Sequence, residues 1–251
     1  MVIIYIFIDI IILIIMQLIL EKVKRKNGNF KKLRNFSNFS QEELAKNLSL
    51  DKDTIAMYEI GKVSPSFKSL IKIINFYNIS LDFLLLEENC LYPRNLKLLN
   101  LARKLDDTTF LQERNHIEIT AKSLLNNNKD NNIVIKQDNT IDIQLYNDNF
   151  NLNLKNIRKY RNIKQIEMTN LINVPKSTLS MYEFSNYPPK DKLVNISEIL
   201  NISIHALSTG EKLFFDFQDR LFGKTMLLAD RFLSLDDQKF IIKLMENIIN
   251  S

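Results

Sequence analysis

The sequence is poor in the residues from which catalytic, metal and phosphate-binding sites are built. It has one cysteine, two histidines, four glycines and no tryptophan among 251 residues. Because Cys90 stands alone, an intramolecular disulfide and a cysteine-based zinc site are both excluded. His116 and His205 lack a Cys, Asp or Glu partner at ligand or triad spacing, and the glycines are too dispersed for a phosphate-binding turn. We therefore predict no catalytic residue, no metal site, no cofactor and no enzymatic activity.

The scarcity of glycine and proline also favours long helices over a sheet protein with many turns. Only four glycines and five prolines interrupt the chain, in which 45% of residues are hydrophobic and 25% are charged. This balance is typical of a globular protein, and a domain usually takes about 100 to 200 residues, so two domains are expected. The formal net charge of +5 is compatible with a polyanionic partner without requiring one. The abundance of isoleucine, asparagine and lysine indicates the AT-rich genome of a low-GC bacterium, a phage or a mobile element.

Residues 1–28 combine a long apolar run with a basic segment. Val2 to Leu20 is almost continuous Ile, Leu and Phe, long enough as a helix to span about 30 Å of hydrocarbon. The lysines and arginines that follow would then keep the rest of the chain in the cytoplasm. Asp9 argues against a membrane anchor, because a charge at the centre of such a helix costs about 2.5 to 3.5 kcal/mol. Translation from Met16, or a buried or partner-binding helix, are the open alternatives.

One short stretch occurs twice in the chain. "DKDTIAMYE" at residues 51–59 and "PKSTLSMYE" at residues 175–183 share five identities at an offset of 124 residues. The similarity extends over Phe30 to Leu86 and Leu154 to Gly210, where apolar residues recur at helical spacing. The predicted core residues of the two copies, in matching order, are Leu33, Leu44, Leu48, Ile55, Tyr58, Leu70, Ile73, Ile79 and Leu84, and Ile157, Met168, Ile172, Leu179, Tyr182, Leu193, Ile196, Ile202 and Leu207.

Local signals divide the first copy into short helices. Ser40 and Glu43 form the pattern of a capping box ahead of an apolar run. Asp51 is expected to cap the next helix, and Gly61 to take the left-handed position that ends it. In the second copy Pro175 replaces the polar cap, and Asn186 is the candidate for the left-handed residue.

The segments "SQEELAKNLSLDKDTIAMYEIGKVSP" and "KQIEMTNLINVPKSTLSMYE" resemble the Cro and phage-repressor type of helix-turn-helix, the xenobiotic-response-element family. This resemblance implies an all-α fold with two five-helix lambda-repressor-like DNA-binding domains, whose third helices enter the DNA major groove. Those helices are expected at about Lys52 to Ile60 and at Pro175 or Lys176 to Phe184.

The resemblance also implies which side chains meet DNA. A glutamine opens the second helix of each copy, where it contacts phosphate and braces the third helix, and exposed residues of the third helix face the bases. The implied DNA-binding residues are Gln41, Asp51, Lys52, Asp53 and Met57 in the first copy, and Gln165, Pro175, Lys176, Ser177, Ser180 and Met181 in the second. The implied structural pairs, which tie the first helix to the third, are Arg34 with Glu59 and Arg158 with Glu183.

The chemistry of the two third helices differs. Lys52 and Lys176 are suited to donate to guanine, and Ser177 to pair with several bases. Asp51 and Asp53 place carboxylates where phosphate is near, which is unfavourable unless they accept from cytosine. We therefore predict two unlike half-sites for one covalent pseudo-dimer.

The remaining segments are two spacers and a linker. Each copy, at 29–90 and 151–210, is followed by a predicted helical hairpin, at 91–128 and 211–251. Asp106-Asp107 and Asp236-Asp237 are expected to form the turns of these tails, which either make a homodimer or pack on their own domain. The Asn-rich stretch 129–150 is a flexible linker or a small β-hairpin.

The sequence thus predicts a cytoplasmic, sequence-specific DNA-binding transcriptional regulator, most simply a repressor, whose partner is double-stranded DNA. Two alternatives stay open: a regulator tethered to the inner face of the membrane through Val2 to Leu20, and an antitoxin-like or adaptor module that binds protein.

Overall fold

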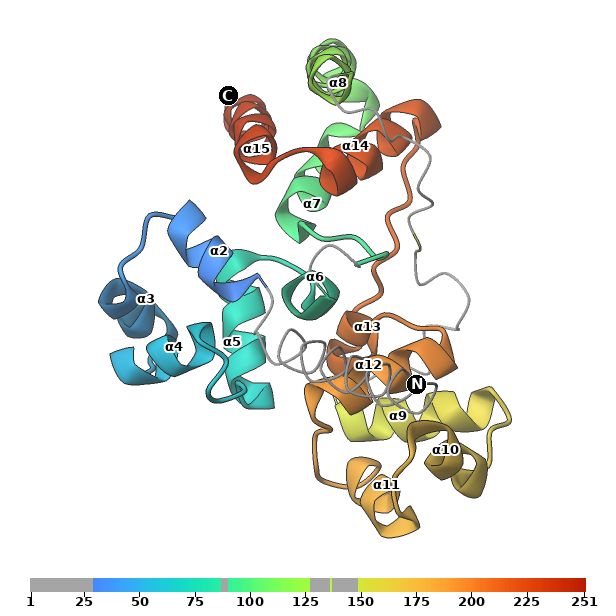
Figure 1. The fold of residues 1–251 in the computed structure, drawn as a ribbon. Helices are drawn as coiled ribbons and strands as arrows, with labels where there is room; N and C mark the ends of the chain where they lie inside the picture. Colours follow the sequence, from blue (N-terminus) through green and yellow to red (C-terminus); the bar gives the residue numbers. More distant parts are fainter. Residues whose placement is uncertain (1–28, 87–89, 127–135, 137–148) are drawn as a thin grey trace, which may run out of the picture. The chain divides into compact units, whose positions relative to one another are not determined.

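The computed structural model describes residues 29–86, 90–126, 136 and 149–251 (Figure 1). The chain divides after Ile73 into two compact units, an N-terminal and a C-terminal unit, each described by itself below. Two expectations, the apolar helix Val2 to Leu20 and the hairpin within 129–150, lie outside the described residues. Among the described residues, no helix combines the length and hydrophobicity needed to cross a membrane.

The N-terminal unit holds the start of the first sequence copy. Its helices are α2 (Phe30–Phe36), α3 (Gln41–Leu48), α4 (Lys52–Glu59) and the first part of α5 (Phe67–Tyr77). α3 packs against α4, and α2 also contacts α4. The predicted core is confirmed here, because Leu33, Leu44, Leu48, Ile55 and Tyr58 are all buried.

The C-terminal unit holds the rest of that copy, both tails and the second copy. Its elements are the end of α5, α6 (Leu81–Leu86), α7 (Leu96–Leu105), the 3-10 helix η2 (Thr108–Phe110), α8 (Leu111–Leu125), α9 (Phe150–Tyr160), α10 (Gln165–Ile172), α11 (Lys176–Tyr182), α12 (Lys190–Leu200), α13 (Ile204–Thr209), α14 (Arg220–Phe232) and α15 (Leu235–Ile249). The described residues contain no strand, only an isolated antiparallel bridge between Ile79 and Asn95. The all-α prediction is therefore confirmed for this part of the chain.

Asparagine performs the backbone role that glycine has in most helical proteins. Within the part of the chain that the structure describes, six residues other than glycine have positive φ, and five of them are asparagines: Asn38, Asn78, Asn162, Asn173 and Asn201, with Ser49 as the sixth. Asparagine tolerates the left-handed conformation better than other side chains, so it ends helices in a chain that has few glycines. Gly61 takes this conformation as predicted, with φ of 70°. Asn186 does not, and that prediction was wrong.

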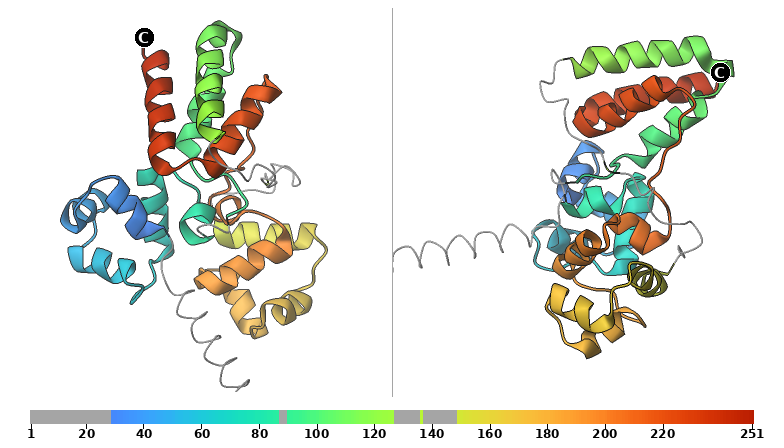
Figure 2. Two further views of the ribbon diagram at one scale, coloured as in Figure 1. Left: turned by 45° about the horizontal axis from the view of Figure 1, so that its top comes forward. Right: turned by 90° about the vertical axis from the view of Figure 1, so that its right-hand side faces the viewer.

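The two helical tails pack together. α7 and α8 lie beside α14 and α15 in the views of Figures 1 and 2, and each helix of one tail contacts both helices of the other. Each tail consists of two consecutive helices as predicted, but one predicted turn is wrong. Asp106 ends α7, whereas Asp236 and Asp237 lie in the first turn of α15, which Ser234 caps.

Gly223 occupies a helix interior where a larger residue has no room. A Cβ atom at this position would lie 2.6 Å from the Cβ atom of Phe217, a buried side chain that stacks edge-on against Phe222. Alanine in place of glycine in a helix normally stabilises by roughly 0.5 to 1 kcal/mol. At position 223 the clash with Phe217 makes the same substitution destabilising.

We expect Gly223→Ala to lower the free energy of unfolding by about 1 to 3 kcal/mol, the usual cost of overpacking. Urea unfolding followed by circular dichroism measures the change. Lys224→Ala is the matched control, because the neighbouring Lys224 is exposed and its loss should change stability by less than about 0.5 kcal/mol. A more stable Gly223→Ala protein would contradict the predicted clash.

Candidate nucleic-acid interface

The first copy forms a helix-turn-helix from α3 and α4. The predicted capping box is present at the start of α3: the Glu43 N–H donates to Ser40 Oγ at 3.1 Å, and the Ser40 N–H donates to Glu43 Oε2 at 2.7 Å. Ser49, with φ of 51°, ends α3 and turns the chain toward α4. Lys72 Nζ donates to the Leu48 carbonyl at 3.0 Å, so an α5 side chain satisfies the free end of α3. The turn is therefore fixed from both sides.

The second copy builds the same turn with different residues. Glu167 accepts from the Lys164 N–H at 2.8 Å, but the other half of a capping box is absent there because a lysine side chain has no acceptor atom. Asn173, with φ of 50°, takes the place of Ser49. Lys192 Nζ donates to the Ile172 carbonyl at 2.9 Å, which repeats the contact of Lys72 from a position one helical turn away.

A buried network holds α4 in the first copy. Arg34 of α2 donates through Nε and Nη2 to the Glu59 carboxylate, with 3.0 Å for the second contact, and Gln41 Nε2 donates to the same carboxylate at 2.8 Å. The exposed fractions of the two charged side chains are 13% for Arg34 and 2% for Glu59. Burial acts to raise the pKa of Glu59, but hydrogen bonds from Arg34 and Gln41 outweigh it and lower that pKa. The carboxylate is thus held ionised.

The second copy repeats this network around α11. Arg158 donates to both carboxylate oxygens of Glu183, with 3.1 Å from Nη2, and Gln165 Nε2 donates to it at 2.8 Å. Only 7% of the Arg158 and 4% of the Glu183 side chain is exposed. The structure therefore brings together both pairs singled out in the sequence, and it places each glutamine against the pair, where it braces the third helix.

The proposed base-facing residues of the first copy lie on the outer face of α4. Asp51, Lys52, Asp53 and Met57 are all exposed, while Ile55 points into the core. Asp51 has the extended backbone of an N-cap residue, but its side chain accepts no capping hydrogen bond, so the expected cap is not made. Its carboxylate is therefore not used by the helix itself.

The corresponding residues of the second copy lie on the outer face of α11. Pro175, Lys176, Ser177, Ser180 and Met181 are exposed. Because the uncharged Pro175 and Ser177 take the places of Asp51 and Asp53, this face is the more favourable one for a polyanion. The outer faces of α4 and α11 are therefore held by the same kind of ion pair but differ in charge.

Two features near α4 and α11 are not predicted from the sequence. Asn151 Nδ2 donates to the carbonyls of Tyr182 at 2.6 Å and Asn186 at 2.9 Å, and so closes the end of α11, where no left-handed residue is present. No local pattern indicates this contact, because the partners are more than 30 residues apart. Ile60 and Phe184 are equivalent large apolar residues just after Glu59 and Glu183, and they are 70% and 85% exposed. Apolar side chains beside a reading helix are suited to the methyl group of thymine.

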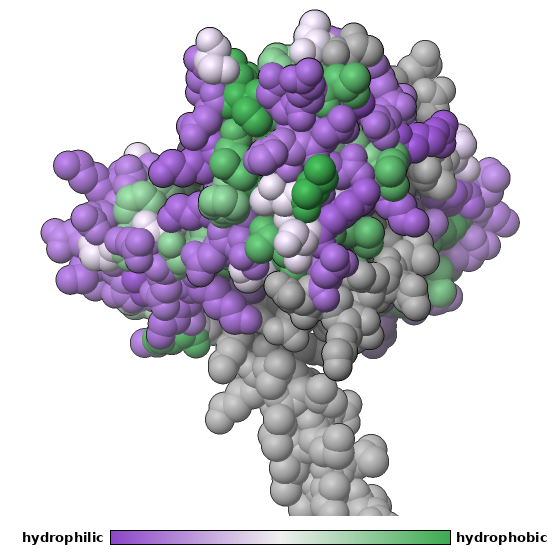
Figure 3. All heavy atoms as spheres, turned by 90° about the horizontal axis from the view of Figure 1, so that it is seen from above, coloured by the Kyte–Doolittle hydropathy of each residue, from purple (hydrophilic) through white to green (hydrophobic). Residues whose placement is uncertain are grey.

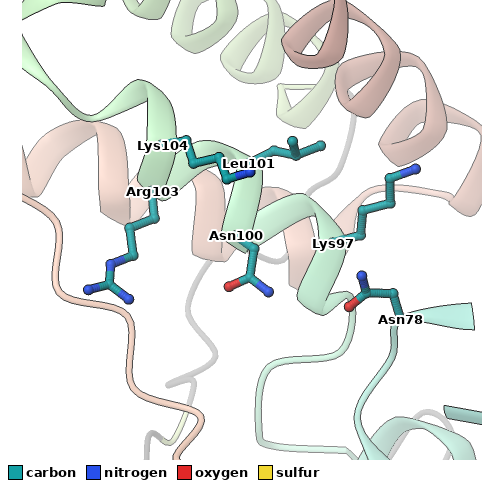
Figure 4. A pocket seen from close by; sticks show the side chains of 6 residues that line it. All are labelled: Asn78, Lys97, Asn100, Leu101, Arg103 and Lys104. Atoms are coloured by element: carbon teal, nitrogen blue, oxygen red, sulfur yellow. The ribbon is translucent and has the colours of Figure 1, made fainter. Parts of the chain in front are cut away.

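One depression at the surface of the described residues is a weak candidate for a small-ligand site. The depression on α7 is lined by Lys97, Arg103 and Lys104 together with neighbouring residues, but Figure 4 shows these side chains pointing in different directions, and Lys97 already pairs with Glu246 at 2.7 Å. The described part of the chain contains no cluster of His, Cys, Asp and Glu that could hold a metal ion. Cys90 is buried, and burial raises the pKa of its thiol.

Comparison with known proteins gives matches in both copies. Residues 30–84 match a helix-turn-helix family model, and residues 155–215 match the model of the bacteriophage CI repressor helix-turn-helix domain. The chain is 36% identical over 61 residues to the helix-turn-helix-type transcriptional regulator YqaE of Bacillus subtilis strain 168, which covers 24% of this chain and 53% of YqaE. It is 40% identical over 55 residues to the SPbeta prophage-derived regulator YonR of the same strain, which covers 22% of this chain and 51% of YonR.

A third relative is matched over nearly its whole length. The chain is 36% identical over 62 residues to a helix-turn-helix-type transcriptional regulator of Methanocaldococcus jannaschii, which covers 25% of this chain and 94% of that protein. By contrast, the chain spans about half the length of the two Bacillus relatives. No solved structure matches the chain.

The buried pair in the second copy yields a stability prediction. Glu183→Gln keeps the shape of the side chain but leaves the Arg158 charge buried without a counter-ion, so the free energy of unfolding should fall by about 3 to 5 kcal/mol. The exposed Glu198 of α12 provides the control variant Glu198→Gln, which should leave stability unchanged within about 0.5 kcal/mol. Equal effects of the two substitutions in urea unfolding would show that the pair does not hold α11.

Proposed function

This chain belongs to the family of helix-turn-helix transcriptional regulators, and we propose that it regulates transcription by binding double-stranded DNA through α4 and α11. One observation carries the proposal: each copy fixes a short helix by a buried Arg–Glu pair and leaves its outer face exposed and polar. A rigid helix with a free polar face is what reading of the major groove requires.

Base contacts in this proposal come from the exposed side chains. Lys52 and Lys176 donate to guanine O6 and N7, and Ser177 pairs with several bases. In the second copy, the neighbouring backbone N–H groups at the start of α11 favour phosphate oxygens. Gln41 and Gln165 each donate one amide hydrogen to Glu59 and Glu183. The second amide hydrogen and the carbonyl oxygen of each glutamine can therefore bind DNA.

The two copies are proposed to read different sequences. Asp51 and Asp53 are positioned to accept from cytosine amino groups, and they disfavour sites where only phosphate is within reach. Pro175 and Ser177 at the equivalent positions carry no charge. The operator is therefore two unlike boxes rather than a palindrome, and occupation of a promoter by the bound chain makes the protein a repressor in the cytoplasm.

Selection of binding sites from random duplex DNA with the full chain tests this proposal. We expect enrichment of two boxes of different sequence at a fixed spacing. Recovery of a single box would mean that one copy does not read DNA, and a lack of any enrichment would reject DNA reading in favour of a protein-binding adaptor.

Single substitutions then assign each box to one copy. Lys52→Ala and Lys176→Ala should each relax the base preference in one box and weaken binding about 5- to 150-fold, the equivalent of 1 to 3 kcal/mol for one base contact. Lys224→Ala removes an exposed lysine of α14 and serves as the control. Fluorescence anisotropy at one fixed salt concentration measures the affinities, because phosphate contacts make binding salt-dependent. The same loss on both boxes from one substitution would contradict the assignment.

A further inference from the structure

The repeat of the sequence extends into the tails. α8 and α15 each have 15 residues and begin at Leu111 and Leu235, 124 positions apart. α7 and α14 begin at Leu96 and Arg220, also 124 positions apart. The tails thus return to the offset of 124 that relates α4 to α11, whereas α6 and α13, which begin at Leu81 and Ile204, are 123 positions apart. Repeat 1 (29–126) therefore corresponds to repeat 2 (149–251) with a shift of one residue in the closing helices.

Asp230 of repeat 2 is buried against repeat 1. It is 1% exposed, and its two carboxylate oxygens accept from the backbone N–H groups of Arg94 at 2.9 Å and Asn95 at 2.6 Å. These two residues lead into α7. A carboxylate in the last turn of one tail helix thus binds the start of the other repeat's tail.

Asp106 of repeat 1 makes the reciprocal contact. It is 3% exposed and accepts from the backbone N–H groups of Gln218 and Asp219, with 3.1 Å for the second. Asp106 and Asp230 are equivalent positions at the offset of 124, and so are the two pairs of donors. The tails are therefore related to each other by an approximate two-fold axis within one chain.

The equivalent side chains at this interface are chemically different. Asn95 Nδ2 donates to Gln238 Oε1 at 3.0 Å, while at the equivalent place Arg114 Nη2 lies 3.2 Å from Asp219 Oδ2. One contact is a neutral amide pair and the other is an ion pair. Pairing of two copies of the same repeat would set Asn95 against Arg114 and Asp219 against Gln238, and would lose the ion pair.

The same asymmetry occurs where α6 meets α13. Asp82 is fully buried, and its carboxylate accepts from the N–H groups of Ile204 at 2.9 Å and His205 at 3.0 Å, while the Leu81 N–H donates to His205 Nδ1 at 3.4 Å. Asp82 and His205 are equivalent positions. Two copies of repeat 1 paired in this way would bury Asp82 against Asp82, and like charges in one buried site are strongly unfavourable.

The pairing of the tails buries an apolar core, although Leu111, Ile119, Leu221 and Phe240 stay exposed. Fully buried side chains come from both repeats, namely Leu98, Leu99, Ala102, Leu105, Ile117 and Ala121 from repeat 1 and Phe222, Met226, Ala229, Ile241 and Met245 from repeat 2. Figure 3 shows hydrophilic residues predominating on the face seen from above, with hydrophobic ones scattered between them.

We propose that repeat 1 and repeat 2 of one chain are each other's dimerisation partner, and that the unlike pairs at their interface exclude pairing of like repeats between chains. One chain is then a closed pseudo-dimer with a single pair of helix-turn-helix modules. The proposal rests on contacts within the C-terminal unit and stands independently of DNA binding.

An exchange of the two α6–α13 residues tests the proposal. His205→Asp sets two carboxylates against each other, and Asp82→His removes the carboxylate that accepts from both the Ile204 and the His205 N–H groups. Each substitution should therefore raise the unfolding equilibrium constant of the full chain roughly 10- to 100-fold. The double variant Asp82→His/His205→Asp moves the carboxylate to the other side of the approximate two-fold axis. There it can accept from the N–H of Leu81, so the double variant should recover at least about tenfold of the summed losses.

All these variants carry Glu211→Gln, because Glu211 Oε2 lies 3.2 Å from His205 Nε2 and would repel a carboxylate at position 205. Urea unfolding followed by circular dichroism gives the equilibrium constants. Purely additive losses in the double variant would overturn the proposed two-fold relation.

The mass of the assembly tests the partner directly, even if a variant fails to fold. Native mass spectrometry of the unmodified full chain, released from a non-ionic detergent because Val2 to Leu20 is apolar, should show the 29.5 kDa single chain across a range of concentrations. A species of twice that mass that persists on dilution would overturn pairing within one chain, whether it arose from like repeats or from repeats exchanged between two chains.

Discussion

Buried carboxylates have to be matched by hydrogen-bond donors, and for three buried aspartates of this protein those donors come from the other half of the chain. Asp82, Asp106 and Asp230 each accept two backbone N–H groups that belong to the other repeat. Burial raises the pKa of Asp230 to about 6, while the N–H groups of Asn95 and Arg94 act in the opposite direction. The contact that buries each carboxylate therefore also supplies its donors, so the loss of one donor segment within the folded pair would leave a buried charge unmatched. The two tails stabilise each other through these contacts.

A buried Arg–Glu ion pair in each helix-turn-helix holds the inner side of the third helix and leaves its outer side exposed. Arg34 with Glu59 and Arg158 with Glu183 fix the inner side of α4 and α11, so the outer side is free to vary. The identities between "DKDTIAMYE" and "PKSTLSMYE" include this glutamate and the buried tyrosine, whereas Asp51 and Asp53 differ from Pro175 and Ser177 on the exposed side. The two copies therefore share the buried residues that hold the third helix and differ in the exposed residues of that helix.

The sequence predicts the parts of this fold that depend on local spacing. The capping box of Ser40 and Glu43, the repeated core and the glycine at position 61 all follow from short-range rules. Pairing of the tails does not, because the contact of Asp230 with Asn95 joins residues 135 positions apart. The two Asp-Asp pairs are not equivalent in the structure, because Asp106 corresponds to Asp230 at the offset of 124, whereas Asp236 and Asp237 lie in the first turn of α15. Asn151, likewise, closes α11 from a distant helix without a local signal.

The central claim is that one chain supplies both modules for one operator. Titration of a short duplex carrying a single selected two-box site with the full chain, followed by native mass spectrometry of the complex, measures this directly. We expect one chain per duplex at saturation, with both boxes protected from nuclease digestion. Two chains on the same duplex, each protecting one box, would contradict it.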